Sequence, residues 1–95
     1  MIMIGTPKFQ IGKLVATPGA LAAMSEAGQN AMHFVSRHIV GDWGECCEED
    51  KRANEDALAQ GERLLSVYRT SKDEKIWVIT EADRSSTCVL LPDEY

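Results

Sequence analysis

The hydrophobic pattern of this chain changes its period near Gly61, and this change constrains the fold more than any other feature of the sequence. Between residues 17 and 60, apolar residues recur every three or four positions, which is the spacing of one face of an α-helix. From residue 63 onward they alternate with polar residues, which is typical of half-buried β-strands. This order predicts a small two-layer α+β domain, in which two to three helices pack on an antiparallel sheet.

The alternating part divides into three predicted strands. RLLSVYR and KIWVIT are joined by the polar loop TSKDE, and TCVLL follows EADRSS and ends before Pro92. Together they predict a three-stranded antiparallel C-terminal meander. Near the start, FQIGKLVA also alternates and predicts an N-terminal edge strand in which Phe9, Ile11 and Val15 share one side.

Helix signals surround two short segments. Thr17 can cap a helix that has Pro18 in its first position and ends at Gly28, and Asn30 can cap a second one that ends at Gly41. The spacing predicts a buried side for each helix. These sides consist of Leu21 and Met24 in the first helix and of Ala31, Phe34, Val35, His38 and Ile39 in the second.

The segment from Asp42 to Gly61 allows two interpretations. Asp42 followed three residues later by Glu45 resembles a capping box, which would make the segment one helix. A turn followed by a shorter helix fits equally well. In either case, the predicted buried side contains Ala53, Ala57 and Leu58.

Length and composition limit the class of protein. The 95 residues predict a single domain over residues 1–95, and 44 % hydrophobic with 26 % charged residues is typical of a globular chain. No apolar run approaches the roughly 20 residues that span a bilayer. The start, MIMIGTPKFQ, lacks the basic segment, long apolar region and cleavage site of a signal peptide. We therefore expect a cytoplasmic protein without membrane contact.

The cysteine pattern favours reduced thiols. The chain has three cysteines, Cys46, Cys47 and Cys88, and two of them are adjacent in sequence. Neighbouring cysteines rarely form a disulfide with each other, and neither C-x-x-C nor a histidine pair at zinc spacing occurs. We expect no metal and no cofactor.

Negative charge is concentrated in one segment. Residues 42–62 contain eight acidic and two basic residues, a charge of −6, whereas the whole chain carries −5. An acidic stretch repels phosphate backbones, so direct nucleic-acid binding is not expected. The segment is either a solvated helix face or a docking patch for a protein partner with a basic surface.

The candidate partner-binding residues are charged or aromatic. Trp43 can anchor the start of the acidic segment by burial or serve as an exposed interaction anchor. Trp77 is expected to lie with Ile79 on the sheet face opposite the core, where a second copy could bind. The full set is Asp42, Trp43, Glu48, Glu49, Asp50, Trp77, Asp83 and Arg84.

The chain contains no motif that specifies a reaction, such as a P-loop or G-x-S-x-G. A histidine such as His38 on an apolar helix face is more often a core residue than a general base. Asp83 and Arg84 lie in TEADRSS, where turn chemistry alone explains the polar residues. A ribonuclease would have to use His38, Arg37, Arg69 and Arg84.

Two stretches, RHIVGDWG at residues 37–44 and the final run from RLLSVYR to LLPDEY at residues 63–95, resemble one protein family. Its members are small uncharacterised proteins of bacterial plasmids, integrative elements and phages, labelled "plasmid-related protein". The resemblance extends from Leu14 in LVATPGAL to Tyr95 and implies an accessory gene of mobile DNA. It supplies no catalytic residues.

Three functions follow as hypotheses. The favoured one is a non-enzymatic protein-binding module that acts through its acidic segment, for example as a counter-defence or regulatory inhibitor. The order of helices and strands suggests, by analogy of fold alone, a small barnase- or RelE-like RNase toxin. The third is a homo-oligomeric accessory subunit that associates through Trp77 and Ile79.

Overall fold

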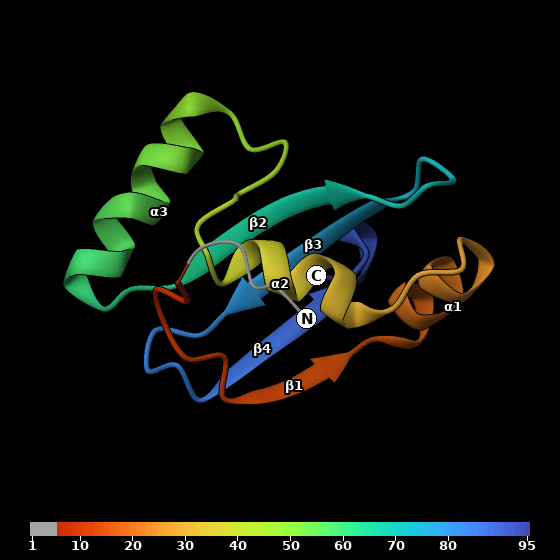
Figure 1. Cartoon of the computed structure of the whole chain (residues 1–95), viewed down its shortest axis with the longest axis horizontal. Coiled ribbons are helices and arrows are strands. Elements are labelled where there is room, and N and C mark those ends of the chain that lie inside the picture. Colours follow the sequence, from red (N-terminus) through yellow and green to blue (C-terminus); the bar gives the residue numbers. More distant parts are fainter. Residues whose placement is uncertain (1–5) are drawn as a thin grey trace.

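The computed structural model describes residues 6–95, which form three α-helices, four β-strands and one short 3-10 turn. Residues 1–5, which include the apolar start of the sequence, lie outside the described residues. Figure 1 shows α2 lying across one face of the sheet and α3 standing beside β2. The elements are β1 (Lys13–Ala16), α1 (Pro18–Glu26), α2 (Ala31–His38), α3 (Glu48–Gln60), β2 (Leu64–Arg69), β3 (Lys75–Thr80), β4 (Ser86–Leu90) and η1 (Pro92–Glu94).

The predicted α+β class and the C-terminal meander are confirmed. The strand order is β1-β4-β3-β2, and β2–β3 and β3–β4 pair antiparallel. β1 is added at the edge as predicted, but it runs parallel to β4, with Lys13 opposite Ser86. The sheet is therefore mixed and not wholly antiparallel. Alternation of side chains gives the faces of a strand but not its direction.

Side-chain caps begin the first two helices, as their sequences predict. The Thr17 hydroxyl accepts a hydrogen bond from the Ala20 amide at 3.2 Å, and Asn30 accepts one from the His33 amide at 3.2 Å. The predicted buried side of α2 is correct, whereas that of α1 is partly wrong. Leu21 is 55 % exposed, and α1 buries two alanines together with Met24.

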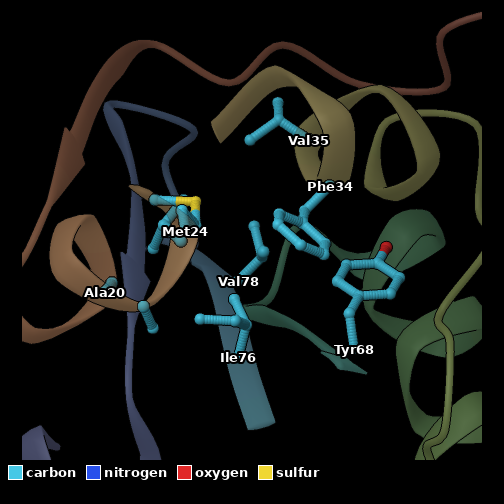
Figure 2. Packing of buried hydrophobic residues seen from close by; sticks show 9 residues of the cluster. Ala20, Met24, Phe34, Val35, Tyr68, Ile76 and Val78 are labelled. Carbon is cyan, nitrogen blue, oxygen red and sulfur yellow. The ribbon is translucent and has the colours of Figure 1, made fainter. Parts of the chain in front are cut away.

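The main core lies between the sheet and helices α1 and α2. In Figure 2, Phe34 from α2 faces Tyr68 from β2, with the β3 side chains of Val78 and Ile76 beside them. The centroids of the Phe34 and Tyr68 rings are 5.8 Å apart. Met24 closes the same cluster from α1. Apolar burial of this kind is the main stabilising contribution in a domain of this size.

Gly12 shifts the inward side of the N-terminal segment by one residue. Its φ of +62° is left-handed, and an added Cβ would lie 2.3 Å from the Ser85 carbonyl oxygen. Ile11 packs on the main core before the glycine, and Leu14 does so after it. Val15 is consequently 39 % exposed, so the prediction that it shares a side with Ile11 is wrong.

Residues 42–61 form a turn followed by a helix. Asp42 accepts a hydrogen bond from the Gly44 amide at 3.1 Å within the turn, and α3 begins only after Cys47. The predicted capping box is therefore wrong. The predicted burial of Ala53 is also wrong. Ala53 is exposed, and the neighbouring Asn54 is buried instead.

Candidate functional site

The face of the sheet opposite α1 and α2 is apolar, and we call it the open face. Leu64, Ser66 and Tyr68 of β2 point toward the helices, so the alternate residues of the strand point the other way. The registers of the four strands extend this alternation across the sheet. The apolar side chains on the open face are those of Val15, Leu65, Val67, Trp77, Ile79, Cys88 and Leu90.

A groove of about 340 Å³ lies on the open face over β2 and β3. The ring of Tyr95, 68 % exposed, packs edge-on against Trp77 with a centroid distance of 5.7 Å and forms one wall. Leu65 and Ile79 contribute apolar lining, and Arg63 is the charged residue among those that line the groove. Such a volume matches the lower end of pockets that take small ligands or single side chains.

Arg63 and the C-terminal turn hold Tyr95 in this position. The Arg63 guanidinium donates to the Tyr95 hydroxyl at 2.7 Å and forms an ion pair with the Glu81 carboxylate at 3.6 Å. In the preceding turn, the Glu94 carboxylate accepts hydrogen bonds from the Thr17 hydroxyl at 2.5 Å and from the Gly19 amide at 3.1 Å. The Thr17 hydrogen bond lowers the pKa of Glu94. The anchored turn thereby fixes the aromatic wall of the groove.

Trp77 is placed as predicted, on the open face with Ile79. Trp43 is not an exposed anchor. It is 4 % exposed, packs with Phe9 and His38, and donates its indole N–H to Glu55 at 2.8 Å. The aromatic neighbours on the core side of the sheet draw it inward, so its assignment to a partner-binding set is corrected.

The predicted acidic residues have structural contacts of their own. Asp42 pairs with Arg37 at 2.8 Å, and this hydrogen bond lowers the pKa of Asp42. Glu48, Glu49 and Asp50 are exposed in the first turn of α3, where negative charge is favourable at a helix N-terminus. Helix stabilisation therefore accounts for their position without a partner.

Arg84 ties the β3–β4 turn to the end of α3. It has a φ of +61°, and its guanidinium donates to the backbone carbonyls of Glu62 at 2.5 Å, Glu81 at 3.1 Å, Ala82 at 3.2 Å and Ala57 at 3.2 Å. Asp83 accepts a hydrogen bond from the Ser85 amide at 3.0 Å in the same turn. TEADRSS is thus a turn whose arginine is used for structure.

We expect the substitution Arg84→Met to lower the free energy of unfolding by about 2 kcal/mol, because several carbonyls lose a charged donor. Methionine keeps an unbranched, largely apolar side chain without the guanidinium donors, and it has no greater cost in the left-handed backbone conformation. Chemical unfolding of the variant measures the loss. Arg52→Met on the exposed side of α3 is the matched control, with an expected loss within about 0.5 kcal/mol. Equal losses for the two variants would contradict the role of Arg84.

His38 is fully buried in a chain of hydrogen bonds. Its Nδ1 lies 2.5 Å from the Ser66 hydroxyl and its Nε2 lies 2.9 Å from the Thr80 hydroxyl. Thr80 and Thr87 are linked at 2.7 Å, and Thr87 donates to the Ile11 carbonyl at 2.8 Å. Because the Ile11 carbonyl can only accept, Thr87 donates to it and Thr80 donates to Thr87. The Nε2–H of His38 therefore donates to Thr80, and its Nδ1 accepts from the Ser66 hydroxyl.

Burial lowers the pKa of His38 to about 4, and the positive charge of Arg84 adds to this effect. The neutral ring therefore satisfies the chain of hydroxyls at neutral pH. Both nitrogens are occupied and the ring is inaccessible, so the geometry describes a structural histidine.

The four residues of the ribonuclease hypothesis do not form a common cleft. Arg37 stacks on Tyr68 and pairs with Asp42, while Arg69 pairs with Glu45 at 3.0 Å and with Asp73 at 3.4 Å. His38 and Arg84 both approach Phe9, but the imidazole is buried. Each cation is already engaged by the protein itself.

Sequence reasoning missed most of the groove. The alternation in RLLSVYR contains the signal for Leu65, since it faces away from Leu64. For Arg63 and Tyr95 no local signal exists, because their contact joins residues 32 positions apart.

Within residues 6–95, no group of three or more histidine, cysteine, aspartate or glutamate side chains could hold a metal ion. None of the helices in this same range is long and apolar enough to cross a membrane. The three cysteines are free thiols, and burial raises the pKa of Cys46.

Comparisons with protein-family models, with curated proteins and with solved structures found no match to this chain.

Proposed function

We propose that this protein is a non-enzymatic protein-binding module and that the open face is its docking surface. The observation that carries this proposal is the groove between Trp77 and Tyr95 on a sheet face that lacks a helical layer in the described residues. Tryptophan, tyrosine and arginine are the residue types that dominate interface energetics, and Trp77, Tyr95 and Arg63 all border the groove. An apolar side chain of the partner would fill it.

The acidic segment is a second docking surface in this proposal. Its exposed acids Glu48, Glu49 and Asp50 stand together in the first turn of α3, and this helix lies beside the β2 edge of the sheet. Such a charge cluster speeds association with a basic partner surface without adding much affinity. The resemblance to plasmid-related proteins favours a role as an accessory protein of mobile DNA in the bacterial cytoplasm, where an inhibitor of a host protein is one concrete form.

Affinity capture with the wild type and two matched variants tests the proposal. A specific partner retained by the wild type should bind Trp77→Thr at least tenfold more weakly in a titration with the purified partner, because the groove loses a wall. Met32→Gln removes another exposed apolar side chain, 50 % exposed on α2, and should bind like the wild type. Equal affinity of all variants for the partner would refute the open face as docking surface.

A third variant addresses the acidic segment. Glu48→Lys combined with Glu49→Lys and Asp50→Lys should slow association with a basic partner and remove its salt dependence, while the dissociation rate stays the same. An unchanged association rate would assign these residues to helix stabilisation alone.

A further inference from the structure

The two edges of the sheet differ in how their backbone groups are used. At the β2 edge, the Asn54 side chain donates to the Leu65 carbonyl at 2.7 Å and accepts from the Leu65 amide at 3.1 Å. Two residues further, the Val67 amide donates to the Trp43 carbonyl at 3.1 Å, and the Val67 carbonyl accepts from the Glu45 amide at 2.7 Å. The outward backbone groups of both strand residues are therefore satisfied, and the edge is closed along Leu65 and Val67.

The β1 edge has no such cover. The amides of Lys13 and Thr17 donate to the Ser85 and Val89 carbonyls, each at 3.0 Å, so the alternate residues Leu14 and Ala16 point their backbone groups outward. No hydrogen bond from residues 6–95 reaches these outward groups. Figure 1 shows β1 along the outer border of the sheet. An edge of this kind is a template for another strand.

We propose that β1 of a second copy pairs antiparallel with β1 across a two-fold axis at Val15. In this register, Leu14 lies opposite Ala16 of the second copy and Ala16 opposite its Leu14. Each of these pairs exchanges two N–H···O bonds, so the four outward groups of each copy are all satisfied. The two Val15 side chains, 39 % exposed in the single chain, then meet at the axis.

Charge complementarity identifies a second copy as the occupant. In the same register, Lys13, whose side chain lies on the open face, is opposite Thr17 of the second copy. The Thr17 hydroxyl donates to the Glu94 carboxylate, so this carboxylate stands beside the incoming Lys13 ammonium. Within the described residues, Lys13 forms no ion pair of its own. The two-fold axis repeats this pair, so two complementary contacts flank the four hydrogen bonds.

The proposed dimer forms one continuous eight-stranded sheet. A two-fold axis perpendicular to the sheet keeps both open faces on the same side, so the two grooves face the same direction. Only the functional use of this shared orientation rests on the proposed docking function. The pairing itself involves only β1 and Glu94. Since a strand of four residues buries little area, we expect a weak dimer that dissociates in the micromolar to millimolar range.

Sedimentation equilibrium from micromolar to millimolar protein tests the pairing. Val15→Asp places two carboxylates against each other at the axis and should weaken dimerisation at least tenfold. Met32→Asp makes the same kind of change at another exposed apolar residue and should leave it unchanged. Lys13→Glu should also weaken the dimer, and its difference from the wild type should shrink at high salt.

Ala16→Pro provides a test that does not change charge. It removes an outward N–H that the pairing with β4 does not use, so the single chain should keep its fold, checked by circular dichroism, and lose dimerisation. A wild type that stays monomeric up to millimolar concentration overturns the proposal. So does a dimer that tolerates Val15→Asp and Ala16→Pro but is lost in Trp77→Thr. Neither result bears on partner capture, which tests the docking function separately.

Discussion

An alanine at position 44 should lower the free energy of unfolding by at least about 3 kcal/mol, a large part of the roughly 5–10 kcal/mol expected for a domain of this length. Gly44 has a φ of +72°, and a left-handed conformation costs a residue with a Cβ about 1–2 kcal/mol. The added Cβ would also lie 2.0 Å from the Val67 carbonyl oxygen and 2.6 Å from Cδ1 of Tyr68. The backbone must move away, which breaks the two hydrogen bonds that join Val67 to Trp43 and Glu45 at the β2 edge. Urea unfolding measures the loss.

Gly28→Ala is the matched control for this experiment. Gly28 has a similar φ of +67°, but nothing lies within 4 Å of an added Cβ. It should therefore show the conformational cost alone, about 1 kcal/mol. The difference between the two variants isolates the close approach of residue 44 to β2, and equal losses would contradict that approach.

Acidification from pH 7 to pH 5 should lower the free energy of unfolding by about 2 kcal/mol through His38 alone. The unfolded side chain takes up a proton near pH 6.5, whereas the buried ring stays neutral until the pH reaches about 4. Between these values the unfolded state binds the additional proton. The contribution of His38 to stability is thus complete above pH 6.5 and falls as the pH drops toward 4. Urea unfolding at several pH values measures this slope.

The environment of His38 explains why it resists protonation. A proton on Nδ1 would turn the acceptor of the Ser66 hydroxyl into a second donor, and the hydroxyl would have to reverse. The other groups around the ring are the Thr80 hydroxyl, the aromatic rings of Phe9 and Trp43, and the positive charge of Arg84. None of these accepts a proton in this range. The lowered pKa values of Asp42 and Glu94 act at lower pH, below the range in which His38 dominates.

Two histidine variants separate this effect from general acid sensitivity. His38→Gln carries no titratable group at this position, so its stability should be nearly flat between pH 7 and pH 5. His33→Gln changes an exposed histidine of α2 and should keep the slope of the wild type. A full slope in His38→Gln would show that another group is responsible.

Features set by neighbouring residues could be predicted from the sequence. The caps at Thr17 and Asn30, the apolar face of α2 and the hairpin at TSKDE depend on contacts within a few positions of the chain. Alternation in KIWVIT was enough to place Trp77 on the face away from the core. In each case the determining interaction is local, so the residue pattern contains it.

Other features depend on contacts between distant segments. The left-handed Gly12 reverses the inward side of the first strand because the turn around Ser85 passes directly beside it. Trp43 is buried by Phe9 and His38, and no local sequence pattern indicates that these three side chains pack together. The groove likewise needs Arg63 and Tyr95 to meet. Such tertiary contacts override local preferences, which are small in comparison with burial.

The position of β4 has a consequence for how the chain folds. This strand is the last of the sheet in chain order, yet it lies between β1 and β3. During synthesis, β2 and β3 can pair with each other before β4 is made. β1 is made first, but it stays unpaired until β4 is available. Loop closure over most of the chain must therefore precede the β1–β4 ladder, which predicts slow, late docking of the N-terminal segment. Until then, β1 exposes both of its edges, and a chaperone that binds extended apolar segments would find its target there.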